Sequence, residues 1–153
     1  MNKSKTDPSA WFDYPVRVQP HHTDYGGVVW HGTYITWMES ARIACIRAAG
    51  LSFEDLVKSG YDLPVVSLDL RYRRPLGLGM EAIVKTRLLP TSGIRLVWEY
   101  AIETAASAAD ASADFSVELC VSGTVTLVTV DVHSRKIVRR QPPAIQKLMT
   151  RGT

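Results

Sequence analysis

One helix-length segment, Thr33–Ala49, constrains the fold of this chain more than any other part of its sequence. On a helical wheel its apolar side chains cover an arc of roughly 200°, whereas a helix that lies on a flat sheet needs a stripe of only about 100°. Gly50, the residue type that most often follows a helix, ends the segment. Because so wide an apolar arc requires burial on several sides, the pattern predicts a sheet that curls around this helix.

About five strands are predicted around the helix. Residues 94–103 and 117–127 alternate apolar and polar side chains, which is the period of a half-buried strand. These two segments are expected to pair as a hairpin, with Val117 and Leu119 pointing inward and Gly123 at a bulge or bend. The remaining strands are predicted at residues 14–20, 66–72 and 81–89. Short turns join the last four strands, so the sheet is expected to be mostly antiparallel.

The chain length of 153 residues, with 46% hydrophobic and 22% charged residues, is that of one globular domain with a substantial core. We assign residues 11–141 to this domain, residues 1–10 to a flexible N-terminal segment, and residues 142–153 to a basic C-terminal tail or short helix. A second helix is expected at residues 52–59, with Ser52 as its cap. The two cysteines, Cys45 and Cys120, lie among apolar residues and are expected to be buried, reduced thiols.

The formal net charge of +3 comes from the ends of the chain. Residues 8–132 contain ten Lys and Arg against fourteen Asp and Glu, whereas the residues after Val132 contain six Lys and Arg and no acid. Nucleic-acid binding, which needs a basic stripe on the folded body, is therefore not expected. No stretch approaches the ~18 apolar residues of a membrane span, and the first ten residues are polar, so a cytoplasmic protein without a membrane segment is expected.

The unusual residues of the chain concentrate between positions 11 and 37, where seven of the 13 aromatic residues and three of the four histidines lie. In this region a loop with two adjacent glycines, Gly26 and Gly27, leads into the start of the long helix. A helix start carries backbone N–H groups without intrahelical partners and can hold an oxyanion. The glycines can fold Asp24 back beside that site, which would place a nucleophile or base next to an electrophilic pocket.

Each of these features also has a plainer interpretation. Asp24 can be a turn residue that binds its own backbone, and Glu39 can be a solvated carboxylate on a helix face. The aromatic cluster can be core or the wall of an apolar pocket. His21, His22, Asp24 and His31 match no established zinc spacing, so no metal site is expected.

The run Asp24-Tyr25-Gly26-Gly27-Val28-Val29-Trp30-His31, followed by Tyr34, Trp37 and Glu39, resembles the signature of the 4-hydroxybenzoyl-CoA thioesterase family of hotdog-fold proteins. The likeness continues at Leu63-Pro64-Val65-Val66 and at Arg74-Pro75-Leu76. It implies an α+β hotdog fold, in which a long central helix is wrapped by a curved antiparallel sheet of about five strands.

By this resemblance, Asp24 is the catalytic carboxylate, acting as nucleophile or as general base for water. The backbone N–H of His31 is the oxyanion donor, and Glu39 matches a position that faces the acyl group in some relatives. Tyr25 and Trp30 are assigned to substrate binding as aromatic residues beside this site. The chain departs from the family pattern at His22, where relatives carry an acid. It also lacks the basic turn of relatives that bind coenzyme A, so the phosphates are assigned to the Ser92 region and Arg95. Four other arginines are alternatives: Arg71, Arg73, Arg74 and Arg87.

The implied reaction is hydrolysis of an acyl- or aroyl-CoA thioester to the free acid and coenzyme A. The resemblance implies no cofactor, since coenzyme A is part of the substrate, and it implies a homodimer or homotetramer with the site between protomers. The alternative is a non-catalytic hotdog module that binds an acyl-CoA or an acyl carrier protein. The basic C-terminal segment is either a solvated tail or a contact for the phosphates of coenzyme A or an acidic carrier protein.

Overall fold

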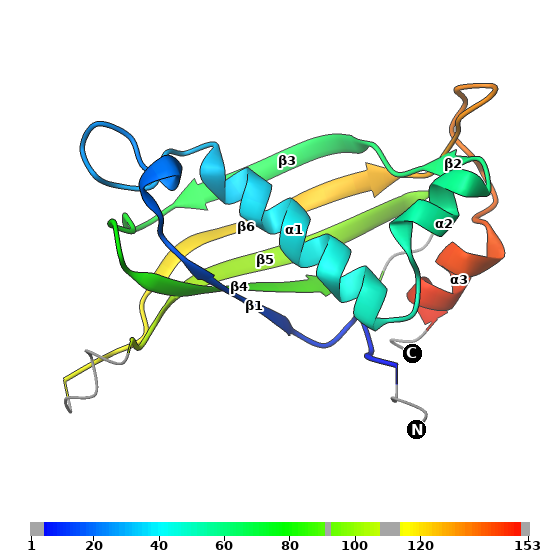
Figure 1. Cartoon of the computed structure of the whole chain (residues 1–153). Coiled ribbons are helices and arrows are strands. Elements are labelled where there is room, and N and C mark those ends of the chain that lie inside the picture. The colour runs from blue at the N-terminus through cyan, green and yellow to red at the C-terminus, as the bar shows by residue number, and fades with distance from the viewer. Residues whose placement is uncertain (1–4, 91–92, 108–113, 151–153) are drawn as a thin grey trace.

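A five-stranded antiparallel sheet forms the body of the protein (Figure 1). The computed structural model describes residues 5–90, 93–107 and 114–150. The strands lie in the order β1-β4-β5-β6-β3, and every neighbouring pair is antiparallel. Their bounds are β1 Phe12–Arg17, β3 Val65–Tyr72, β4 Glu81–Leu88, β5 Arg95–Ala105 and β6 Leu119–Val128. The predicted number of strands and their antiparallel pairing are confirmed.

The long helix α1 (Thr33–Ala48) lies across one face of this sheet, and the sheet curves around it (Figure 1). It packs mainly against β4 and β1. The helix ends one residue earlier than predicted, where the N–H groups of Gly50 and Leu51 bond the carbonyls of Arg47 and Ile46. The predicted α+β arrangement of a central helix wrapped by a curved sheet is confirmed.

The wheel argument needs correction at two positions of α1. Ile35, on the predicted apolar arc, is 40% exposed, while Arg42 is buried with only 6% exposure. The Arg42 Nη1 group donates a hydrogen bond to the Tyr100 hydroxyl at 3.0 Å. A buried guanidinium is tolerated because it finds this polar partner on β5, which a helical wheel cannot show.

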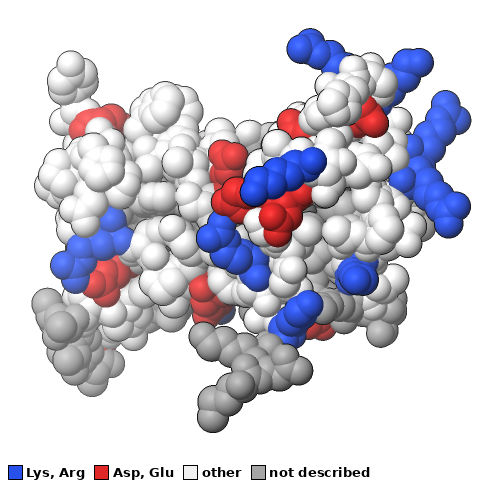
Figure 2. Space-filling model, turned by 45° about the vertical axis from the view of Figure 1, so that its right-hand side comes forward, with Lys and Arg blue, Asp and Glu red and all other residues white. Residues whose placement is uncertain are grey.

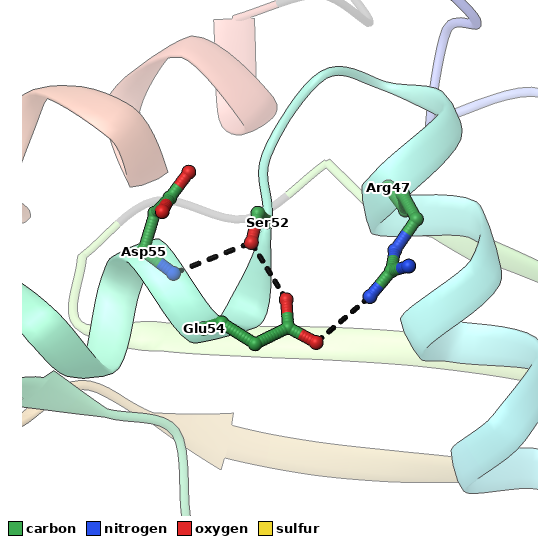
Figure 3. A network of polar contacts seen from close by, with 4 residues as sticks. All are labelled: Arg47, Ser52, Glu54 and Asp55. Atoms are coloured by element: carbon green, nitrogen blue, oxygen red, sulfur yellow. Dashed lines mark hydrogen bonds and ion pairs between the residues drawn. The ribbon is translucent and has the colours of Figure 1, made fainter.

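A polar network fixes the turn between α1 and the short helix α2 (Phe53–Lys58), as Figure 3 shows. Ser52 caps α2, because its hydroxyl oxygen accepts from the Asp55 N–H at 3.3 Å. The same hydroxyl donates to Glu54 at 2.6 Å, and Arg47 of α1 donates to Glu54 at 2.8 Å. The hydrogen bond from Ser52, helped by Arg47, lowers the pKa of the Glu54 carboxyl. The cap predicted at Ser52 is confirmed.

The alternation predicted for β5 is confirmed, since Leu96, Trp98, Tyr100 and Ile102 are all buried. The inward positions predicted for Val117 and Leu119 are wrong, because both are exposed. The strand β6 begins only at Leu119, and its pairing with β5 shifts register between Ile102 and Glu103.

Gly123 sits in regular pairing between Leu70 and Tyr100 rather than at a bulge. A side-chain carbon at Gly123 would lie 2.2 Å from the carbonyl oxygen of Asp69 on β3. The glycine therefore allows the close approach of two strand backbones.

The strand β3 forms one edge of the sheet, where α1 does not cover it (Figure 1). Val66, Leu68 and Tyr72 occupy apolar positions of the strand predicted at residues 66–72, and all three are exposed. Although β3 and β4 follow each other in the chain, they lie at different places in the sheet, and residues 73–80 cross from β3 to β4. We call residues 73–80 the crossing segment.

At the end of the sheet where β3 begins, two short strands pair, β2 (Tyr61–Asp62) and β7 (Val130–Asp131). Near them lies a C-terminal helix, α3 (Pro143–Thr150), which is amphipathic and buries Ile145 and Leu148 (Figure 1). None of the helices in the described ranges has the length and apolar character needed to cross a membrane.

Both cysteines are buried and unpaired, as predicted. Burial raises the pKa of the Cys45 thiol to about 12, so this group stays protonated and unreactive at neutral pH.

Candidate active site

The loop before α1 forms a tight turn around Asp24. The Asp24 N–H donates to the Val28 carbonyl at 2.9 Å, and the Gly27 N–H donates to the Asp24 carbonyl at 3.1 Å. Gly27 has φ of +75°, which a glycine adopts without strain. Tyr25 stands at the tip of this turn and is fully exposed.

The Asp24 carboxylate is oriented by its own loop. Its Oδ1 atom accepts the Gly26 N–H at 2.8 Å, as expected if Asp24 is a turn residue. Among the described residues, nothing bonds Oδ2 or forms an ion pair with this carboxylate. The turn interpretation and the active-site interpretation are thus compatible, because one oxygen anchors the side chain and the other is available to a substrate.

The crossing segment holds the Asp24 loop in place. The Val29 N–H donates to the Leu76 carbonyl at 2.8 Å, and the Leu78 N–H donates to the Gly27 carbonyl at 3.1 Å. On its other side, the loop is tied to His22, whose carbonyl accepts the Trp30 N–H at 3.0 Å. The His22 ring packs edge-on against Trp37, and burial lowers its pKa, so the ring is neutral at pH 7.

His31 lies directly before Gly32, the N-cap residue of α1. Its carbonyl accepts a hydrogen bond from the Tyr72 hydroxyl at 2.9 Å, which ties the helix start to the end of β3. The backbone N–H of His31 has no acceptor among the described residues, and Gly32 caps the helix without a side chain. An N–H group of this kind, at a helix start, can stabilise a developing negative charge.

Asp24 and His31 line one open hollow of about 350 Å³. Tyr34 and Tyr72 form an aromatic wall, with ring centroids 5.7 Å apart. Burial raises the pKa of the Tyr34 phenol, so it stays neutral. The other lining residues are Val29, Arg73, Arg74 and Pro75.

Two arginines of the crossing segment supply the positive charge of the hollow. Arg73 donates to the Ser122 hydroxyl at 3.1 Å, and Arg74 lies 3.5 Å from a Glu118 carboxylate oxygen. Each side chain therefore has a polar partner on β6 or on the residue before it, and both arginines line the same hollow as Asp24.

The structure does not bring the other predicted site residues into this hollow. Trp30 is half exposed and packs at a tilt against the His31 ring, with ring centroids 4.8 Å apart, while Tyr25 points to solvent. Glu39 lies on α1 in a separate groove beside β3. Arg95 begins β5 opposite Val128, at the far end of the sheet from Tyr72, and Ser92 lies outside the described residues.

Sequence reasoning missed Tyr72 as a site residue. Its position as the last residue of a predicted strand, just before Arg73, Arg74 and Pro75, was a usable signal, because strand ends commonly present functional side chains. The described residues contain no group of three or more His, Cys, Asp or Glu side chains placed to hold a metal ion.

Comparison with known sequences decides the family. The profile of the thioesterase-like superfamily matches residues 18–148. The chain belongs to this superfamily. It is 50% identical over 137 residues to "Putative esterase sll0410" of Synechocystis, which covers 90% of this chain and 77% of that protein. It is also 32% identical over 124 residues to "Putative acyl-CoA thioesterase YneP" of Bacillus subtilis, covering 81% of this chain and 83% of that protein.

Solved structures agree with this assignment. The DHNA-CoA thioesterase of Staphylococcus aureus superposes with a TM-score of 0.73 and 28% sequence identity, covering 84% of this chain and 80% of that chain. The predicted family, the hotdog fold and the thioester hydrolase class are confirmed for this superfamily member.

Proposed function

We propose that the protein hydrolyses acyl-CoA thioesters at the hollow lined by Asp24 and His31. The observation that carries the proposal is that two groups line one hollow. One is the Asp24 carboxylate, whose Oδ2 atom has no hydrogen-bond partner among the described residues, and the other is the backbone N–H of His31, which lies at the helix start without an acceptor among them. A thioester carbonyl needs both groups, because attack on its carbon places negative charge on its oxygen.

In the proposed reaction, an oxygen nucleophile adds to the thioester carbon while the His31 N–H bonds the carbonyl oxygen. The nucleophile is either Asp24 itself or a water that gives its proton to Asp24. When water attacks, the C–S bond breaks, the coenzyme A thiolate leaves and takes up the proton held by Asp24, and the acyl group departs as the acid. When Asp24 attacks, loss of the thiolate leaves an anhydride between the acyl group and Asp24. A water then hydrolyses this anhydride, which releases the acid, restores the carboxylate and supplies the proton for the thiolate. Neither route requires a metal ion or a redox cofactor.

The direct test is a panel of acyl- and aroyl-CoA substrates, read by release of the free thiol. Hydrolysis of at least one substrate supports the proposal. Binding of acyl-CoA without thiol release from any of them would favour the alternative, a non-catalytic module.

We further propose that Arg73 and Arg74 hold phosphates of coenzyme A, in place of Ser92 and Arg95. The two guanidinium groups line the same hollow as Asp24, and arginine is suited to phosphate because of its planar set of donors.

The double variant Arg73→Gln/Arg74→Gln is therefore expected to raise KM for acyl-CoA by about tenfold, in line with two lost charge-assisted contacts, and to change kcat less than twofold. Steady-state kinetics with one acyl-CoA measure this. Arg17→Gln, on β1 at the opposite edge of the sheet from β3, is the control and should leave KM unchanged. An unchanged KM in the double variant would remove the arginines from the binding site.

The protein is proposed to work as a homodimer joined along β3. This edge strand exposes unpaired backbone and several apolar side chains, a combination that monomeric proteins avoid. Beside it, α1 and β3 enclose an apolar groove of about 320 Å³ that contains Glu39. Antiparallel pairing of two β3 strands would continue the sheet from one copy to the next and bring this groove toward the second copy.

Leu68→Asp places a charge in the middle of β3, on the wall of that groove. The variant is expected to be a folded monomer with activity reduced at least about tenfold, because a buried unpaired charge opposes strand pairing. Light scattering coupled to size-exclusion chromatography and the thiol-release assay measure the two effects. Leu68→Val, which keeps an apolar side chain at the same position, is the matched control. A fully active Leu68→Asp monomer would exclude a site shared between protomers.

A further inference from the structure

The cations of this protein form two sets that differ in their partners. On the sheet, Arg17, Lys85 and Arg87 each form an ion pair with a carboxylate. A second set has no ion-pair partner among the described residues, and we call it the basic end. Its members are Lys58, Arg135, Lys136, Arg139, Arg140 and Lys147.

The basic end lies where α2, the β2–β7 pair and α3 come together, and Figure 2 shows Lys and Arg side chains projecting from that part of the surface. The Val132 N–H donates to the Gly60 carbonyl at 2.9 Å, which joins the end of α2 to the residues after β7. All six cations are exposed.

Residues 129–141, which carry four of these six cations, are held in the fold by hydrogen bonds. The Val138 N–H donates to the Thr129 carbonyl at 2.8 Å, and the Thr129 hydroxyl donates to Gln141 at 2.6 Å. The side-chain amide of Gln141 in turn donates to the Ile94 carbonyl at 3.1 Å. The acid of this segment, Asp131, accepts the N–H groups of His133 and Ser134, which lowers its pKa. The backbone that carries four of these cations is therefore part of the fold rather than a loose tail.

Apolar side chains are exposed among these cations. Ile137 is 48% exposed, Val57 is 45% exposed and Val132 is 39% exposed. A surface that mixes unpaired cations with aliphatic groups suits an acidic protein, which can neutralise the charge and cover the apolar side chains together. A nucleic-acid backbone would satisfy only the charge.

We propose that the basic end docks a small, strongly acidic carrier protein that presents an acyl group as a thioester. The proposal rests on the thioesterase function and the β3 dimer proposed above. Within one protomer, the basic end and the Asp24 hollow lie at opposite ends of β3, about 25 Å apart at ~3.3 Å per residue. Antiparallel pairing of two β3 strands sets the basic end of one copy beside the hollow of the other, where a carrier's thiol arm can reach Asp24.

The test compares wild type with Arg135→Gln/Arg139→Gln/Arg140→Gln. The matched control, Arg17→Gln/Lys85→Gln/Arg87→Gln, removes the same charge from the ion-paired set. The first measurement is fluorescence anisotropy with an acyl carrier protein that bears its pantetheine thiol but no acyl group. We expect the basic-end variant to bind at least about tenfold more weakly at low salt, and the control to stay within twofold of wild type.

The second measurement is hydrolysis of one acyl group presented on the carrier protein and on coenzyme A. In the basic-end variant, kcat/KM should fall about tenfold for the carrier-bound substrate and less than twofold for acyl-CoA. An equal fall for both substrates, or no fall for either, would overturn the proposal. Tighter binding of wild type to anionic vesicles or duplex DNA than to the carrier protein would also overturn it.

The two measurements separate the docking proposal from the proposed function. If the carrier protein binds through the basic end but neither thioester is hydrolysed, the function fails and the docking surface stands. If acyl-CoA is hydrolysed but the carrier protein does not bind, only the docking surface fails.

Discussion

Replacing Asp24 with Asn is expected to lower kcat for acyl-CoA hydrolysis by about 10²–10⁴, with little change in coenzyme A binding. The amide keeps the shape of the side chain and can still accept the Gly26 N–H through its oxygen, so the turn should persist. The amide supplies neither a nucleophilic carboxylate oxygen nor a base, so only the rate of the chemical step should fall.

Single-turnover and steady-state thiol release measure this loss, and inhibition by free coenzyme A reports binding. Asp13→Asn is the matched control, because Asp13 is an exposed carboxylate on β1, 3.8 Å from Lys85 and outside the hollow. Wild-type turnover in Asp24→Asn would mean that another group performs the chemistry, and the assignment of this hollow would then be wrong.

Gly123→Ala is expected to destabilise the fold by about 3 kcal/mol, at the upper end of what overpacking usually costs. The added carbon would lie 2.2 Å from the Asp69 carbonyl oxygen and 2.6 Å from a Leu70 methyl carbon, so β3 and β6 must separate. For a domain of this size the melting temperature should fall by roughly 6–12 °C.

The same substitution should also reduce activity, because β3 ends at Tyr72, whose hydroxyl positions the His31 carbonyl. Thr124→Ala, on the neighbouring residue of β6, is the control and is expected to cost less than about 1 kcal/mol. Thermal unfolding followed by circular dichroism measures both variants. A melting temperature within about 1 °C of wild type in Gly123→Ala would show that the two strands are free to move apart.

The prediction of the fold from sequence succeeded where side-chain periodicity reports burial directly. The wide apolar arc of α1 and the alternation in β5 belong to the centre of the domain, where each apolar residue has a partner layer. The exposure of Val66 and Leu68 on β3 could not be predicted, because alternation does not show whether a strand is central or at an edge. The prediction was wrong at Gly123, because the sequence does not distinguish a glycine that lets two strand backbones approach closely from a glycine at a bend.

The candidate site could be predicted from sequence only in its local part. Asp24 and His31 lie seven residues apart on one turn and one helix start, so spacing along the chain suffices to place them together. Tyr72, Arg73 and Arg74 reach the same hollow because the end of β3 lies against the helix start, where the Tyr72 hydroxyl bonds the His31 carbonyl, a contact between residues 41 positions apart. Arg95 was assigned from a turn in relatives, and no local rule indicates that it begins a strand at the other end of the sheet.

The crossing segment has a consequence for redesigning the specificity of this enzyme. It carries the two arginines of the hollow and, through Leu76 and Leu78, the hydrogen bonds that hold the Asp24 loop. An insertion or deletion between Tyr72 and Met80 would therefore displace Asp24 together with Arg73 and Arg74, the residues proposed to carry out the reaction and to bind phosphate. Libraries that aim at new acyl groups should therefore keep the length of this segment constant.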